Sequence, residues 1–348
     1  MTNSVIGVVV AQLGTPAAPT ARALRPYLKQ FLSDMRVVDY NPLVWQLLLN
    51  AVILNTRPRR SARLYRRIWT AEGSPLLVNT RKQADGLQAR LGSDYRIVVG
   101  MTYGEPSITA AVRGLQAEGI DRILILPMFP QYSSSTSASV YDAAYTAAAG
   151  RRCPLFHEHK RHVPTLRFVG PYYDYPGYIA ALAASVREDL AAWGQTPDML
   201  VMTFHGNPAR YTRDGDPYRT HCETTARLLA DALELPSTEW TVSFQSRFGP
   251  EEWLQPYTDE TLVRLAQAGV RRVAVVCPGF TADCLETLDE IGNEGAHAFM
   301  AAGGSALRLI PCLNDYPLWL DALATLVQRE TASWYSPCLA HLPAAAYH

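Results

Sequence analysis

Lysine is scarce in this chain, and its cysteines do not come in CxxC pairs. The 348 residues carry 32 Lys and Arg side chains against 32 Asp and Glu, and only Lys29, Lys82 and Lys160 are lysines. The formal net charge is +0, which excludes a whole-surface attraction to nucleic acid. The six cysteines are scattered, which argues against a zinc finger or a disulfide framework and indicates a reducing compartment.

Long apolar runs and several common catalytic motifs are also missing. Leu43–Leu54 is the longest apolar segment near the start, and it is shorter than the roughly 20 residues that span a bilayer. The first residues lack the charged and apolar regions of a signal peptide. The sequence contains no GxGxxG, GxxxxGK[ST], GxSxG or HExxH motif. We therefore expect a cytoplasmic protein without the usual nucleotide loops.

Short apolar runs alternate with helical patterns along most of the chain, which is typical of a parallel α/β sheet. The predicted strands are residues 5–11, 96–101, 122–126, 199–204, 240–244, 273–277 and 306–310. The predicted helices are residues 21–32, 43–54, 75–91, 109–118, 179–193, 220–233, 258–268, 281–290 and 318–328. The pattern predicts two similar doubly wound, Rossmann-like lobes, each with a roughly four-stranded parallel sheet and flanking helices.

The domain boundary is expected within residues 148–176, which are rich in Arg, His, Pro and Tyr and show no periodicity. We expect an N-terminal lobe over residues 1–165 and a C-terminal lobe over residues 166–314. A helix at about 315–330 is expected to pack back on the first lobe. Residues 331–348 look like a poorly ordered tail.

An acidic segment follows one of the predicted strands. Pro278 and Gly279 end that strand, and Asp283, Glu286 and Glu290 follow at i, i+3 and i+7. A helix beginning near Thr281 would place the three carboxylates on one stripe. Its apolar face would carry Leu285, Leu288 and Ile291. Such a stripe suits a cation or the uptake of protons, and a solvated helix face explains the same spacing.

His205 lies directly after the strand DMLVMTF and before a glycine. Ligands of open α/β sheets bind at the carboxyl ends of the strands, and a histidine there can accept a proton or bind a metal. A structural histidine is the alternative. Because the acidic segment also follows a strand end in the same half, we expect His205 and Glu286 to face each other across one cleft.

Two further clusters have open roles. The arginine-rich run from Arg57 to Arg67 adjoins the apolar segment Leu43–Leu54, which suits a greasy carboxylate ligand, an acidic membrane surface or a solvated helix face. His157, His159 and His162 form an HxHxxH pattern in the boundary segment. They fit a transition-metal site or a loop with no ligand.

Several motifs together resemble the ferrochelatase family, whose members catalyse the last step of protohaem synthesis. They are AQLGTP, KQFLSDMRVVD, GSPL, LPMFPQYSSST, HGNP, GDPY, FQSRFG and PGFTADCLETLDEI. The resemblance extends roughly from Ile6 to Leu326 and is greatest to proteobacterial members that use protoporphyrin. It implies the chelatase type of two-lobed fold and an enzyme that inserts Fe²⁺ into protoporphyrin IX.

The resemblance also implies roles for individual residues. His205 and Glu286 match the catalytic metal-site pair, and Asp283 and Glu290 match an acidic path along the same helix. The family positions that lie near the porphyrin are matched in this chain by Leu13, Arg57, Tyr65, Ser74 and Tyr132.

Cofactor, partners and location are implied in the same way. Some members hold an iron–sulfur cluster through one internal and three C-terminal cysteines, but the internal position here is Ser134 and the tail offers only Cys338. A cluster normally needs four ligands, so we expect no permanently bound cofactor.

The expected partners are protoporphyrin IX and Fe²⁺, with a peripheral membrane contact through Leu43–Leu54 and no nucleic acid. Coproporphyrin or cobalt as substrate, and a non-catalytic haem or metal carrier, remain alternatives.

Overall fold

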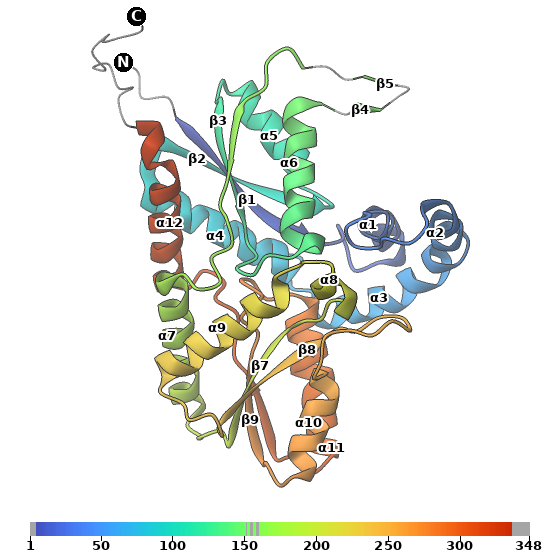
Figure 1. Cartoon of the computed structure of the whole chain (residues 1–348), viewed down its shortest axis with the longest axis vertical. Coiled ribbons are helices and arrows are strands. Elements are labelled where there is room, and N and C mark those ends of the chain that lie inside the picture. The colour runs from blue at the N-terminus through green and yellow to red at the C-terminus, as the bar shows by residue number, and fades with distance from the viewer. Residues whose placement is uncertain (1–4, 151, 154–155, 158–159, 336–348) are drawn as a thin grey trace, which may run out of the picture.

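Two four-stranded parallel sheets form the framework of the molecule (Figure 1). The computed structural model describes residues 5–150, 152–153, 156–157 and 160–335. The first sheet has the order β2-β1-β3-β6, from Tyr95–Tyr103, Ile6–Gly14, Arg122–Pro127 and Thr165–Phe168. The second has the order β10-β9-β7-β8, from Ala306–Leu309, Arg272–Val276, Met199–His205 and Trp240–Gln245. The predicted fold class, two lobes with about four parallel strands each, is confirmed.

Helices cover both faces of each sheet, and this explains why the central strands read as continuous apolar runs. In the first lobe, α5 (Ile108–Ala117) and α6 (Ser139–Ala149) pack against one face, and α4 (Pro75–Leu91) packs against the other. In the second, α7 (Pro176–Trp193) and α9 (Tyr218–Leu233) cover one face. The opposite face carries α10 (Thr258–Gln267), η4 (Glu286–Gly295) and α11 (Ala296–Ala301). Strand β1, for example, is buried at every position except Leu13.

One hydrophobic cluster runs through both lobes. It contains Val8 of the first sheet, Met202 of the second and Trp319 of α12 (Pro317–Tyr335). Figure 1 shows α12 beside the first sheet and α7 beside the second, along one side of the molecule. The two helices pack against each other, and α12 also packs against α4. The lobes therefore share part of their core.

The predicted limits of the domains fall close to the ends of strands and helices. Residue 165, the predicted end of the first lobe, is the first residue of β6, which pairs with β3 in the first sheet. The segment before it contains a two-residue antiparallel pair, β4 (Arg152–Cys153) with β5 (Phe156–His157). The domain division itself stays a prediction. The tail was predicted to begin at residue 331, and this start was wrong because α12 continues to residue 335. Residues 336–348, with Cys338, lie outside the described residues.

A helical lip projects from the first lobe on the side opposite α12 (Figure 1). It consists of α1 (Ala21–Leu32), α2 (Pro42–Leu48), η1 (Leu49–Ile53) and α3 (Leu54–Ile68). The predicted helix Leu43–Leu54 thus continues without a break into the arginine-rich segment, through one π-helical turn. The described helices include none with the length and hydropathy that crossing a membrane requires.

Short helices complete the framework. They are η2 (Gly92–Asp94), η3 (Ser134–Ala138) and α8 (Ala209–Arg213). The serine-rich segment after β3 is partly helical. Residues 134–138 form a π-helical turn that leads directly into α6, and Ser133 caps it by accepting a hydrogen bond from the Ser135 backbone nitrogen.

Candidate active site

The candidate site lies at the carboxyl edge of the second sheet, where ligands of parallel sheets bind. Strand β7 ends at His205 and β8 ends at Gln245, and these two residues are paired in register. The loop after β9 leads into η4, which carries Glu286 and Glu290. Three segments far apart in the sequence therefore bring the predicted histidine and glutamates to the same edge.

The ring of His205 has one nitrogen engaged by the backbone. Its Nδ1 lies 2.7 Å from the carbonyl oxygen of Gly206. Because a carbonyl only accepts, we assign the proton to Nδ1, which leaves the lone pair on Nε2. The ring is half-buried, and the Trp253 ring lies 6.3 Å away between centroids. An oriented imidazole with a free basic nitrogen can accept a proton or bind a metal.

The acidic helix differs from the predicted one in its start and in its winding. The expected α-helix from Thr281 was wrong, because residues 278–284 form turns and an irregular connection, and η4 is a π-helix from Glu286 to Gly295. Nothing in the residue spacing signals this winding, since π-helices are rare and occur mostly at functional sites. Asp283 consequently precedes the helix and does not share its surface stripe.

Glu290 is tied to the end of the neighbouring strand. Its carboxylate accepts hydrogen bonds from the Ser246 backbone nitrogen, at 2.7 Å, and from the Ser246 hydroxyl. Ser246 adopts φ of 66°, a left-handed conformation that is uncommon outside glycine. Burial raises the pKa of Glu290, the Ser246 bonds and the charge of His205 oppose this, and the charge of Glu286 adds to it. Glu290 therefore lies within electrostatic reach of both His205 and Glu286.

Glu286 is placed by its backbone and faces the first lobe. Gln245 is buried, and its Nε2 donates to the Glu286 carbonyl oxygen at 2.7 Å. Burial raises the pKa of Tyr27 and Tyr65, two lip residues, and the nearby charge of Glu286 raises both further. Cys284 is also close: burial raises the pKa of its thiol, and the charge of Glu286 and a hydrogen bond to it do so too.

Asp283 is buried and engaged at the base of the helix. Its carboxylate accepts from Asn314 Nδ2 at 2.7 Å, from Thr287 Oγ1 at 3.1 Å and from the Cys312 backbone nitrogen at 3.3 Å. These bonds join the connection before η4 to the segment before α12. Asp283 therefore holds η4 in place, and its membership of an acidic path stays a prediction.

Three residues predicted near the porphyrin line the junction between the lip and the second lobe. Leu13 and Tyr65 share one hydrophobic cluster with Leu285 and Leu288. Arg57 is half-buried, its guanidinium lies 4.7 Å from the centroid of the Phe248 ring, and burial lowers its pKa. Leu285 and Leu288 were expected on one face with Ile291, but Ile291 packs into the core of the second lobe instead.

The other two predicted porphyrin residues have different surroundings. Ser74 is 4% exposed, and its hydroxyl lies 2.7 Å from that of Thr15. Tyr132 lines a cavity of about 370 Å³ with Arg36, Asp39 and Arg210 among others. Neither His205 nor Glu286 lines this cavity.

Four residues at the site were not predicted as site residues. They are Tyr27, Trp253, Gln245 and Ser246, and the last two belong to the FQSRFG motif. Their position just after a strand end was the available signal for the last two. Within the described residues, no group of three or more His, Cys, Asp or Glu side chains is placed to hold a metal ion. The His157 side chain and His159 lie outside what the structure describes, and His162 pairs with Asp121 at 2.8 Å.

Two lobes that each contain a parallel sheet, with an oriented histidine and two half-buried glutamates at one sheet edge, fit a metal-inserting chelatase. The Ferrochelatase family model matches residues 5–331, and the chain belongs to that family. It is a lyase of haem synthesis, and its substrates are a porphyrin and iron.

Curated relatives and solved structures agree with this assignment. A ferrochelatase of Azoarcus sp. strain BH72 is 54% identical over 331 residues, covering 94% of this chain and 88% of the relative. Ferrochelatase 1 of Shewanella oneidensis is 48% identical and covers 95% of this chain and 97% of the relative. The structure of SirB from Bacillus subtilis with Fe³⁺ has a TM-score of 0.54 at 12% identity, covering 95% of this chain and 98% of that one. This last likeness concerns the fold alone.

Proposed function

We propose that this site inserts Fe²⁺ into protoporphyrin IX, with His205 and Glu286 as the catalytic pair that also receives the metal. The observation that carries this proposal is that the ends of β7 and β8 and the helix η4 bring the oriented imidazole of His205 to the same sheet edge as Glu286 and Glu290. Leu13, Arg57, Tyr65, Ser74 and Tyr132 are proposed to contact the porphyrin.

The chemistry requires two pyrrole protons to leave as the iron enters. His205 Nε2 takes one proton, and a carboxylate takes the other. Glu290 suits the second role, because burial raises its pKa and so favours the protonated form. Asp283 is proposed to complete the acidic path. Iron must leave the protein for the porphyrin, which favours a site with few ligands over a closed four-ligand one.

A direct assay tests these roles. Purified protein is mixed anaerobically with Fe²⁺ and protoporphyrin, and haem is followed by absorbance. We expect His205→Ala and Glu286→Gln to lose at least about a hundredfold in rate while remaining folded. His297→Ala, at an exposed histidine of α11, and Glu294→Gln, at an exposed glutamate on η4, are the matched controls and should retain activity. Near wild-type turnover by either active-site variant would refute its role.

Substrate choice is tested in the same assay. We expect protoporphyrin with Fe²⁺ to be turned over faster than coproporphyrin with Fe²⁺ or protoporphyrin with Co²⁺. A preference for coproporphyrin would replace the proposed substrate. Binding of porphyrin without insertion of any metal would favour a carrier.

The lip is proposed to touch a membrane surface peripherally, with the protein otherwise in the cytoplasm. Leu43, Val44 and Leu47 are 81%, 68% and 73% exposed, an unusual run of apolar side chains in water. Exposed arginines of α3 follow them in the chain and suit anionic lipid. Flotation with vesicles containing anionic lipid should carry the protein, and Leu43→Gln with Leu47→Gln should abolish this. A wild-type protein that stays at the bottom of the gradient contradicts the membrane contact.

We also propose that no iron–sulfur cluster is bound. The four described cysteines outside the β4–β5 segment, Cys222, Cys277, Cys284 and Cys312, are buried, and burial raises the pKa of each thiol, which disfavours the thiolate that such clusters need. Iron and sulfide analysis of anaerobically purified protein should find neither in stoichiometric amounts. Finding both would overturn the proposal.

A further inference from the structure

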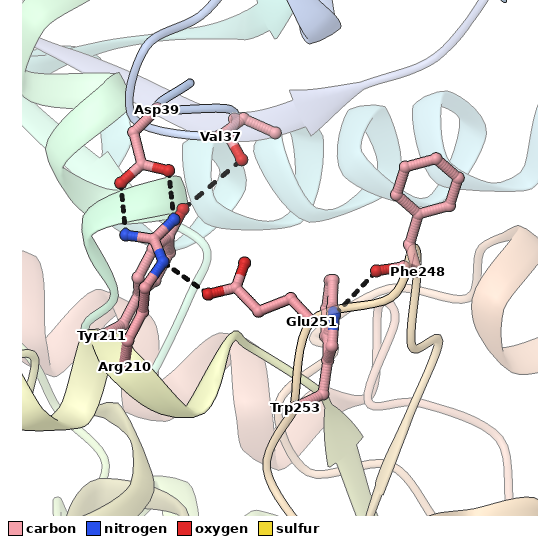
Figure 2. Close-up of polar contacts among 7 residues, drawn as sticks. All are labelled: Val37, Asp39, Arg210, Tyr211, Phe248, Glu251 and Trp253. Carbon is pink, nitrogen blue, oxygen red and sulfur yellow. Dashed lines mark hydrogen bonds and ion pairs between the residues drawn. The ribbon is translucent and has the colours of Figure 1, made fainter. Parts of the chain in front are cut away.

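Arg210 links the segment after β7 to the lip and to the loop after β8 (Figure 2). It lies on α8, five residues after His205. Its Nη1 donates to Asp39 Oδ2 at 2.6 Å, its Nη2 donates to Asp39 Oδ1, and its Nε donates to Glu251 Oε1 at 2.5 Å. One guanidinium thus binds two carboxylates from different segments. The fork geometry of arginine permits this, whereas a lysine ammonium acts as a single point charge.

The two carboxylates belong to segments that reach the site by separate routes. Asp39 lies in the lip, in the connection between α1 and α2. Glu251 lies in residues 246–256, the loop between β8 and α10, which we call the mouth loop. The same loop carries Ser246, which binds Glu290, and Trp253, whose ring lies near His205.

The lip and the mouth loop also meet directly at a residue predicted to bind porphyrin. Arg57 of α3 lies over the ring of Phe248 in the mouth loop. Trp253 Nε1 donates to the Phe248 carbonyl oxygen at 2.8 Å, which connects that ring to the side of the loop near His205 (Figure 2). A change in the spacing between lip and mouth loop would therefore move Arg57 relative to His205.

Backbone contacts fix one side of the mouth loop without Arg210. The Ala209 nitrogen donates to the Glu252 carbonyl at 2.9 Å, and the Leu254 nitrogen donates to the Asn207 carbonyl at 2.9 Å. The lip has a weaker direct tie to α8, the Tyr211 hydroxyl to the Val37 carbonyl at 3.5 Å. The distinctive contribution of Arg210 is thus the charged link between the lip and the loop.

We propose that Arg210 is a positioning residue for iron insertion: through Asp39 and Glu251 it clamps the lip to the mouth loop and sets the spacing between the Arg57–Phe248 contact and His205. This inference rests on the proposed function, because it assigns these two walls to the porphyrin. Arg210 is not itself a catalytic residue, since the described contacts of its side chain are to Asp39, Glu251 and Tyr211.

Steady-state kinetics separate positioning from chemistry. We expect Arg210→Met to raise the KM for protoporphyrin about fivefold or more while kcat and its pH dependence change less than about twofold. Arg210→Lys should recover part of the loss, because it can still bind one carboxylate. Arg308→Met is the matched control. It breaks the ion pair of Arg308 with Asp189, at 2.8 and 2.6 Å, between β10 and α7, and should leave KM unchanged.

A double-mutant cycle tests the route of the effect. Asp39→Asn and Glu251→Gln should each raise KM, and neither should raise it further in the Arg210→Met background. Additive effects would show that the carboxylates act independently of Arg210 and would overturn the clamp.

Hydrogen exchange provides a readout that does not depend on activity. In Arg210→Met, or in Arg210→Lys if the former does not fold, amides of residues 33–41 and 246–256 should exchange faster, with β7 unchanged. Faster exchange throughout β7 would indicate a general structural role, and a KM within twofold of wild type would also refute the clamp. A wild-type protein that inserts no iron would refute the proposed function, while the exchange pattern would still report on the clamp.

Discussion

Ser246→Ala tests the coupling between the end of β8 and the acidic helix. The substitution removes the Ser246 hydroxyl that donates to Glu290 but keeps the backbone nitrogen, which donates at 2.7 Å. Serine and alanine are both strained at φ of 66°, so the backbone term should cancel. The change therefore isolates one hydrogen bond to a half-buried carboxylate.

The size of the effect follows from the charge on the acceptor. A hydrogen bond to a charged group contributes about 1.5–3 kcal/mol, and one between neutral groups about 0.5–1.5 kcal/mol. Losing the hydroxyl should raise the pKa of Glu290 beyond its already raised value. The cost in free energy of unfolding should then be about 1.5–3 kcal/mol where Glu290 is ionised and about 0.5–1.5 kcal/mol where it is protonated.

The pH dependence has a definite sign. Because the folded pKa of Glu290 is raised above 4.5, its native state holds the proton more tightly than the unfolded chain. The stability this group contributes is complete below the unfolded pKa and is lost as pH rises through the folded pKa. Ser246→Ala should therefore destabilise the protein more at about pH 8 than at about pH 4.5.

Urea unfolding at the two pH values measures this difference. In a Glu290→Gln background the carboxylate is absent, so Ser246→Ala should have the same smaller cost at both pH values. An equal cost at both pH values with Glu290 present would refute the reasoning, because it would mean that the hydroxyl does not stabilise an ionised carboxylate.

Three substitutions probe the rest of the site. Gly206→Ala would place a Cβ 2.9 Å from the Gln245 carbonyl oxygen. We expect the free energy of unfolding, measured with urea, to fall by about 1–3 kcal/mol, and kcat to fall as well. Gln245→Leu removes the 2.7 Å hydrogen bond to the Glu286 carbonyl oxygen. The free energy of unfolding should fall by about 1–3 kcal/mol. Ser74→Ala leaves the buried Thr15 hydroxyl without this partner, costing about 1–3 kcal/mol; an unchanged KM for protoporphyrin would remove Ser74 from the proposed porphyrin contacts.

The strands and most helices of this fold could be predicted because local patterns decide them. Strand β7 is a run of buried apolar residues that ends at a polar one, and a parallel sheet between two helical layers requires such a run. The same pattern placed His205 at a strand end, where the structure also has it. Of the lip helices, α1 and the α2–η1 segment were predicted, whereas α3 lies in the arginine-rich run for which a helix face was only one of the interpretations.

The features of the site that could not be predicted from the sequence depend on contacts between segments far apart in the chain. Burial raises the pKa of Tyr27, and the charge of Glu286 raises it further although the two residues are far apart in the chain. Ser246 binds Glu290 because the end of β8 lies beside the first half of η4 and the Ser246 backbone is left-handed. No spacing rule for single elements contains this information.

The winding of η4 follows from such contacts as well. A π-helix is a rare state that a chain does not prefer locally, so tertiary bonds must hold it. Gln245 holds its first carbonyl, Ser246 holds Glu290 one turn later, and Arg67 of α3 lies 3.3 Å from Asp289 on the same helix. These partners come from the second sheet and from the lip. The placement of the glutamates therefore depends on how the lip sits on the second lobe, and a movement of the lip would be transmitted to Glu286 and Glu290, whose roles in metal insertion are proposed above.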